Sequence, residues 1–97
     1  MIQNIKGMPD ILPSETPRWR LMEEKIRGLM DLYSYNEIRT PILEETALFV
    51  RSVGEHTDIV GKEMFTFTDQ GDVQMSLRPE GTAPVMRSYI QNHFHQQ

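Results

Sequence analysis

Residues 77–82, Leu-Arg-Pro-Glu-Gly-Thr, have the side chains needed to bind a small cationic ligand. A predicted strand ends at Leu77, and in the turn that follows Glu80 lies between a proline that fixes the backbone and a glycine that permits a tight turn. Ionised carboxylates make short hydrogen bonds to ammonium groups, roughly twice as strong as those between neutral groups. The turn therefore suggests a site in which Glu80 receives a ligand's ammonium group, Arg78 holds one carboxylate oxygen and Thr82 adds a hydroxyl.

The same residues also fit a purely structural interpretation. Arg78 and Glu80 would then form a surface ion pair in a strand-to-helix turn, which contributes about 0–1 kcal/mol and binds nothing. Thr82 can also cap the helix that follows, which would occupy part of its oxygen. Residue types and spacing leave both interpretations open.

No other group of residues in the sequence predicts a chemical site. His93 and His95 are two positions apart, and such positions on a helix face different directions, so a metal site is not expected there. His56 is expected to be a solvated loop residue. No serine or threonine has a recognisable nucleophile arrangement, and the chain has no cysteine. The sequence therefore indicates neither a catalytic residue nor a metal ligand.

Periodic apolar residues predict two helices before the Glu80 turn. Over residues 15–33 they recur every three or four positions, as on the buried face of a helix. Ser14 is the expected cap of this helix, and Pro17 fits its first turn. The same spacing over residues 43–53 predicts a second helix.

A β-hairpin is predicted directly before the turn. Residues 64–68 and 73–77 are rich in types that suit strands, and residues 69–72 form a turn sequence between them. Two such strands joined by a short turn pair in antiparallel fashion.

A short strand and a final helix complete the expected elements. Residues 36–39 are a strand candidate that ends before Pro41, because proline restricts its predecessor to extended conformations. Thr82 can cap a last helix that reaches about Asn92. The order helix, strand, helix, hairpin, helix predicts one α+β domain over residues 1–97, an antiparallel sheet flanked by helices. So little sheet for three helices suggests that the domain is incomplete.

Composition limits the partners of this segment. The 97 residues carry a net charge of -4, which argues against their wrapping a nucleic-acid backbone. No stretch approaches the roughly 20 apolar residues of a membrane span, and no targeting signal begins the chain, so a cytoplasmic protein is expected. Large apolar residues are expected to form the core and not a cofactor site: Trp19, Met22, Met30, Met64, Phe65 and Phe67.

Four segments resemble bacterial-type histidyl-tRNA synthetases and occur in the same order as in that family. They are residues 6–13, 37–44, 54–60 continuing to 62–67, and 77–83. The resemblance implies a partial class II aminoacyl-tRNA synthetase catalytic domain, whose larger antiparallel sheet would complete the predicted hairpin. It also implies that Glu80 receives the α-ammonium group of the substrate histidine.

The resemblance further implies supporting roles around the turn and a dimer contact. Gly81 and Thr82 would lie beside the bound histidine, with Arg78 in support. Arg39 and Pro41 would belong to the first class motif, which builds the homodimer interface, so self-association is expected.

In this family the whole enzyme activates histidine with ATP, forms histidyl-adenylate and transfers the histidyl group to tRNA(His). The resemblance places the ATP-binding arginines, the imidazole-recognising segment, the third class motif and the anticodon-binding domain beyond Gln97. We therefore expect no catalytic residue, no metal ligand and no bound ATP or Mg2+ in this chain, and no activity from it alone.

Two other functions remain open. The regulatory subunit of ATP phosphoribosyltransferase shares the synthetase fold without catalysis, but its counterpart of the turn usually lacks the glutamate-glycine-threonine order. The other is a stand-alone interaction module that carries the dimer motif. Sequence beyond Gln97 would separate these functions, because the enzyme must continue into an arginine-bearing second class motif.

Overall fold

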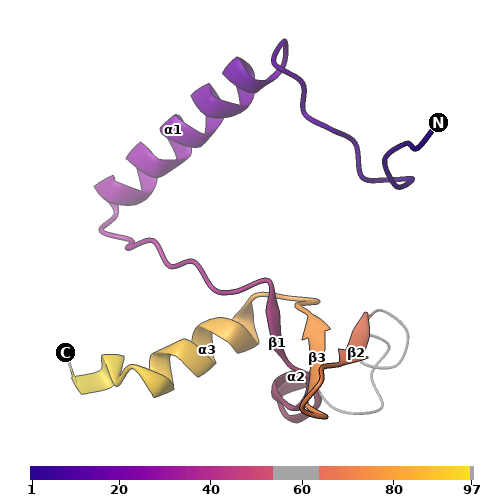
Figure 1. Cartoon of the computed structure of the whole chain (residues 1–97). Coiled ribbons are helices and arrows are strands. Elements are labelled where there is room, and N and C mark those ends of the chain that lie inside the picture. The colour runs from indigo at the N-terminus through magenta and orange to yellow at the C-terminus, as the bar shows by residue number, and fades with distance from the viewer. Residues whose placement is uncertain (54–63, 97) are drawn as a thin grey trace. The chain divides into compact units, whose positions relative to one another are not determined.

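A computed structural model of the chain describes residues 1–53 and 64–96. For residues 52 and 53 it describes the backbone alone. The chain divides into two compact parts, Met1–Glu37 and Ile38–Gln97. Figure 1 shows the elements of each part along the chain. Among the described residues, no helix is both long enough and apolar enough to cross a membrane.

Helix α1 (Thr16–Leu32) is the regular element of the N-terminal part. Pro17 lies in its first turn as predicted, where the missing N–H would have had no acceptor within the helix. The predicted cap is wrong, because Glu15 is the N-cap residue and makes no side-chain cap bond to the helix. Ser14 lies instead in a turn that is closed by a 2.8 Å bond from the Glu15 N–H to the Leu12 carbonyl.

The apolar face of α1 is exposed, contrary to the expectation of a buried stripe. Trp19 is 46% exposed, and Met22 and Met30 are exposed to a similar degree. Residues 1–37 contain no second helix or strand. The large side chains of α1 therefore have no regular element to pack against within this part.

The C-terminal part is built on a three-stranded antiparallel sheet in the order β1-β3-β2. Strand β3 (Gln74–Leu77) lies in the centre and pairs with β1 (Leu43–Glu45) on one side and β2 (Thr66–Thr68) on the other. The predicted hairpin of β2 and β3 is confirmed. One oxygen of Asp69 accepts two backbone N–H groups within its turn. The α+β class with an antiparallel sheet is likewise confirmed.

The first strand lies later in the chain than predicted. Residues 36–39 form no strand, and residues 43–45, predicted as the start of a helix, form β1. The last pair of the β1–β3 ladder is Leu43 and Leu77. Two positions further along the same register, Pro41 would lie opposite Pro79. Neither proline has an N–H to donate to a ladder, so regular pairing cannot continue in that direction.

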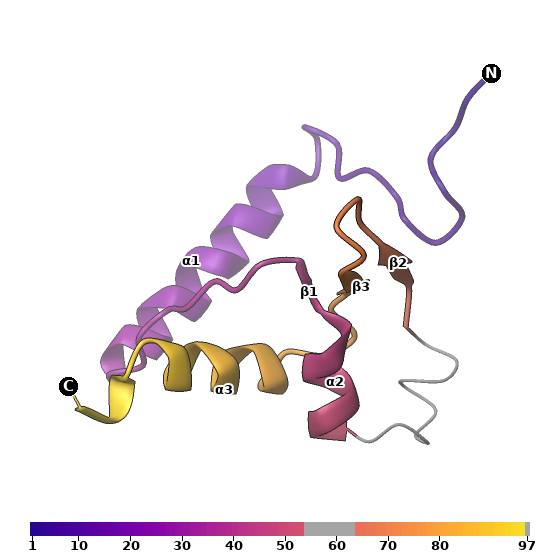
Figure 2. The ribbon, with the colours of Figure 1, turned by 60° about the horizontal axis from the view of Figure 1, so that its bottom comes forward.

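Helices α2 (Thr46–Val53) and α3 (Thr82–Gln91) follow β1 and the turn after β3, respectively. They pack against each other, and α2 also contacts β3 (Figure 2). Phe49 of α2, Pro84 of α3 and Ser76 of β3 are the largest fully buried side chains among the described residues. The core of the C-terminal part therefore lies where α2, β3 and the first turn of α3 meet.

The aromatic residues of the hairpin are not in this core, which corrects a second expectation about burial. Phe65 and Phe67 are exposed, and Met64 is only half-buried. The reason is their position: Phe67 belongs to β2, an edge strand, whereas α2 packs on the central strand β3.

A buried hydroxyl network connects the central strand to its neighbours. Ser76 is 0% exposed, and its hydroxyl lies 2.8 Å from that of Thr46 and 2.9 Å from that of Thr66. Thr46 begins α2 and Thr66 begins β2. One serine therefore joins three elements, and its buried oxygen is satisfied, as burial of a polar group requires.

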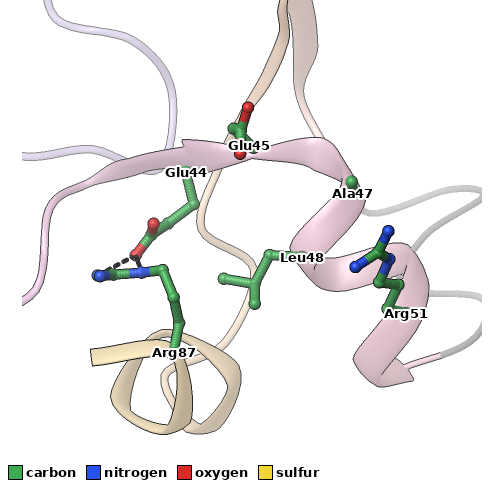
Figure 3. Close-up of a pocket in the computed structure, with 6 residues that line it drawn as sticks. All are labelled: Glu44, Glu45, Ala47, Leu48, Arg51 and Arg87. Carbon is green, nitrogen blue, oxygen red and sulfur yellow. Dashed lines mark hydrogen bonds and ion pairs between the residues drawn. The ribbon is translucent and has the colours of Figure 1, made fainter. Parts of the chain in front are cut away.

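An ion pair connects β1 to α3 (Figure 3). Oε2 of Glu44 accepts hydrogen bonds from Nη2 of Arg87 at 2.9 Å and from Nε at 3.3 Å. The Glu44 side chain is only 8% exposed and that of Arg87 is 30% exposed. Nη1 of Arg87 donates to the side-chain oxygen of Gln91, one turn further along α3. Glu44 thus has a half-buried charged partner, which explains how a carboxylate can occupy an inward position on β1.

Candidate functional site

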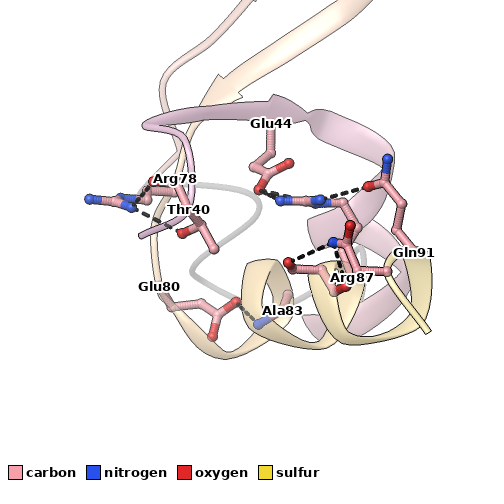
Figure 4. Close-up of polar contacts among 9 residues, drawn as sticks. Thr40, Glu44, Arg78, Glu80, Ala83, Arg87 and Gln91 are labelled. Atoms are coloured by element: carbon pink, nitrogen blue, oxygen red, sulfur yellow. Dashed lines mark hydrogen bonds and ion pairs between the residues drawn. The ribbon is translucent and has the colours of Figure 1, made fainter. Parts of the chain in front are cut away.

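Glu80 lies half-buried in the turn between β3 and α3. Its carboxylate accepts two backbone N–H groups at the start of α3. Oε2 is bonded to Thr82 N at 2.8 Å, and Oε1 is bonded to Ala83 N at 2.9 Å (Figure 4). These donors belong to the first turn of the helix, whose N–H groups have no acceptor inside the helix and which favours negative charge. The helix therefore holds the carboxylate in a fixed orientation.

The capping of α3 differs from the prediction, although the helix itself is confirmed. Gly81 is the N-cap residue and Thr82 is the first residue of the helix. Glu80 supplies the capping bonds that Thr82 was expected to make. Thr82 is an exposed residue, and its hydroxyl is therefore not needed for capping.

Arg78 does not hold Glu80, which corrects both sequence interpretations of this pair. Its Nη1 donates instead to Thr40, at 2.8 Å to the carbonyl oxygen and 3.1 Å to the hydroxyl. Its backbone N–H donates to the carbonyl of Ile42 at 2.9 Å. The physical reason is that the helix N–H groups already orient both oxygens of Glu80, while Arg78 lies across from the segment that leads into β1.

The Glu80 carboxylate retains the capacity to bind a cation. An ionised carboxylate has about four lone-pair sites, and the two backbone N–H groups use one on each oxygen. A Cβ added to Gly81 would meet no atom within 4 Å, so the space beside the turn is open. The turn can therefore accept an ammonium group without giving up its bonds to the helix.

A cavity of about 280 Å³ lies beside the Glu44–Arg87 pair (Figure 3). Its lining residues are Glu44, Glu45, Ala47, Leu48, Arg51 and Arg87. Glu80 is not among them. The sequence did not predict the Glu44–Arg87 pair. No local pattern indicates that a charged strand residue points inward, and Arg87 lies 43 residues away on another element.

The other residues considered from the sequence are not brought together at this turn. Within residues 1–53 and 64–96, no three or more His, Cys, Asp or Glu side chains form a group that could hold a metal ion. His93 and His95 flank Phe94, whose ring packs edge-on against Tyr89 at a centroid distance of 6.1 Å. His56 and the stretch 54–60 of the resemblance lie outside the described residues.

Arg39 and Pro41, the residues expected at a dimer interface, are exposed and belong to the segment without regular structure before β1. Thr40 lies between them and is half-buried. The segment that was expected to contact a second subunit therefore also contains the acceptors of Arg78.

The fold and the turn define part of an α+β domain that presents a fixed carboxylate where a central strand gives way to a helix. Comparison with known proteins shows the family. The sequence model of the histidyl-tRNA synthetases matches residues 7–97. The chain belongs to the histidyl-tRNA synthetase family.

Relatives of known sequence are much longer than this chain. The histidine–tRNA ligases of Staphylococcus saprophyticus and Staphylococcus carnosus are each 58% identical to it over 92 residues, which is 95% of this chain. The chain spans 22% of the length of each of these relatives.

Two solved structures share the fold. The apo histidyl-tRNA synthetase of S. aureus matches 98% of this chain with 46% identity and a TM-score of 0.81, over 25% of its own length. A Bacillus halodurans C protein, described as an ATP phosphoribosyltransferase regulatory subunit/histidyl-tRNA synthetase, matches 92% of this chain. Its identity is 29%, its TM-score is 0.70, and 22% of its length is covered. The helices and sheet described above therefore match part of a histidyl-tRNA synthetase structure.

Proposed function

We propose that this chain is part of a class II histidine–tRNA ligase and contributes the carboxylate that binds the α-ammonium group of histidine. The observation that carries the proposal is the position of Glu80, which helix α3 fixes through two backbone N–H groups. The bound ammonium group would donate to the remaining lone pairs of this carboxylate, in a charge-assisted hydrogen bond. The family match over residues 7–97 supports the choice of histidine as the ligand.

The neighbours of Glu80 would shape the rest of this contact. Gly81 has no side chain, which leaves the open space beside the turn for the ligand. Thr82 would place its hydroxyl, which capping does not use, at the edge of the same space. None of these residues reacts with the substrate, so we assign them to binding and not to catalysis.

In the whole ligase, the histidine carboxylate attacks the α-phosphorus of ATP, and pyrophosphate leaves. The histidyl group of the resulting adenylate then passes to tRNA(His), and AMP leaves. Cationic groups and usually Mg2+ stabilise the charge that develops in such phosphoryl chemistry. The described residues do not form a group that fits a metal ion, so we assign no Mg2+ ligand to them and derive no step through the metal. ATP, Mg2+ and tRNA would meet other parts of a cytoplasmic ligase, and the 97-residue chain alone would be inactive.

A chimeric ligase tests this proposal. In the chimera, this chain replaces the matching 22% of the S. saprophyticus ligase. Histidine-dependent exchange of pyrophosphate into ATP should proceed at a rate comparable to that of the parent, and the isolated chain should give only background exchange. A folded chimera without exchange would contradict the assignment to a ligase, and exchange by the isolated chain would refute its predicted inactivity.

A non-catalytic regulatory subunit is the second candidate, because the B. halodurans protein that shares the fold is described partly in those terms. The two structural comparisons favour the enzyme, because the identity is 46% to the S. aureus synthetase and 29% to the B. halodurans protein. The same chimera separates the two functions, because a segment from a regulatory subunit is expected to give a folded chimera that does not support exchange.

We also propose that the chain forms a homodimer, with Arg39 and Pro41 at the interface. The exposed apolar face of α1 supports self-association, since burial of such a face stabilises a complex. Light scattering over a range of concentrations should give twice the mass of one chain. A folded species with the mass of a single chain at all concentrations would contradict this expectation.

A further inference from the structure

We propose that Arg78 is a positioning residue for the histidine site, and that it acts through Thr40 and not through Glu80. The proposal rests on the proposed role of Glu80 in binding histidine. It starts from the contact of Nη1 of Arg78 with both the carbonyl oxygen and the hydroxyl of Thr40.

The place of this contact follows from the two prolines at the end of the β1–β3 ladder. The last backbone bond in this direction runs from Arg78 N to the carbonyl of Ile42. The next positions of the register, Pro41 and Pro79, have no N–H to donate. Beyond this point the guanidinium of Arg78 connects the two segments in place of the backbone, because it donates to Thr40 on the far side of Pro41.

The Glu80 turn is thereby held at both of its ends. At its helix end, the Glu80 carboxylate is bonded to the start of α3, and α3 is attached to β1 by the Glu44–Arg87 pair. At its strand end, Arg78 attaches the turn to the segment before β1. Figure 4 shows the two arginines reaching the same short stretch of chain, one at Thr40 and the other at Glu44.

Loss of the Arg78 contact should affect binding more than folding. Its hydrogen bonds are exposed, and exposed polar contacts of charged side chains contribute little to stability. A binding group, in contrast, is sensitive to position, because a displacement of about 1 Å can cost on the order of 100-fold in function. The signature of a positioning role is therefore a change in histidine affinity without a matching change in stability.

The test uses the chimeric ligase and steady-state pyrophosphate exchange. Arg78→Ala should raise KM for histidine roughly tenfold, with KM for ATP and the melting temperature unchanged. Arg78→Lys should recover part of the loss, because both contacts come from one nitrogen and a single ammonium group can replace it. Arg51→Ala, which removes another exposed arginine of the C-terminal part, should change none of these values.

Several outcomes would overturn the proposal. An unchanged KM for histidine in Arg78→Ala would overturn it. Equal increases in the KM values for histidine and ATP, together with a lower melting temperature, would also overturn it. If Arg78→Ala does not fold, Thr40→Val serves instead, because it removes one of the two acceptors and keeps the shape of the side chain. An unchanged KM in that variant would also overturn the proposal. Glu80→Gln distinguishes the two inferences: if it weakens histidine binding and Arg78→Ala does not, only the role of Arg78 is wrong.

Discussion

Replacing Glu80 by glutamine in the chimeric ligase should raise KM for histidine about 100-fold, because removing one partner of a hydrogen-bonded charge pair costs about 3 kcal/mol. The amide keeps one oxygen, but its NH2 group would face one of the two N–H donors at the start of α3. The substitution therefore removes the charge that binds the ammonium group and also loosens the attachment of the side chain. Neither effect acts on ATP, so KM for ATP should stay unchanged.

Pyrophosphate exchange at varied histidine and at varied ATP gives both KM values. Glu45→Gln is the matched control, since Glu45 is an exposed carboxylate on β1 and should tolerate the change. An unchanged KM for histidine in Glu80→Gln would show that the substrate ammonium group binds elsewhere.

Glu44→Ala should lower the free energy of unfolding by about 3 kcal/mol, because breaking a buried ion pair leaves the other charge without its partner. Among the described residues, Arg87 would keep its bond to Gln91, with 30% of its side chain exposed. That partial exposure gives its charge some access to water, so we expect the lower end of the range for buried pairs.

The double variant Glu44→Leu with Arg87→Met should be much closer in stability to the original chain, because apolar residues of similar size remove both charges of the pair together. Urea unfolding followed by circular dichroism measures each variant, at one fixed protein concentration because self-association adds to apparent stability. If the single and the double variant lose equal stability, the ion pair does not account for the effect, and lost packing would have to explain it.

The elements that follow from local patterns were predictable from the sequence. Residues 15–33 have helical spacing with Pro17 in the first turn, and α1 occupies nearly the same range. The hairpin of β2 and β3 follows from two strand-like runs around a turn that Asp69 stabilises. In each case residues close in sequence determine the structure.

The strand before α2 was misplaced because its limits depend on a distant partner. Leu43 has the spacing of a helix, but pairing with β3 draws residues 43–45 into the sheet. Pro41 and Pro79 lie opposite each other and end regular pairing. This can be recognised only when the register of β1 and β3 is known. The burial of apolar residues also depends on neighbours, and Trp19 and Phe67 are exposed because no element covers them within their own parts.

The position of the candidate site was predictable from the sequence, but the hydrogen bonds within it were not. Glu80 lies in the strand-to-helix turn as the sequence indicated, because the proline and glycine on either side of it determine the local backbone. The partners of Arg78 lie 38 residues away, and no local pattern encodes a contact of that range. Glu80 was expected to pair with the side chain of Arg78. It accepts the backbone N–H groups of Thr82 and Ala83 instead, because these residues lie two and three positions after it in the sequence.

The most direct test of the central claim compares histidine with imidazole propionate, its analogue without the α-amino group, as ligands of the chimeric ligase. Isothermal titration should show that the original chimera binds histidine about 100-fold more tightly than the analogue, and that Glu80→Gln removes most of this preference. If Glu80→Gln retains the full preference for histidine, the carboxylate does not contact the ammonium group and the assignment of the site is wrong.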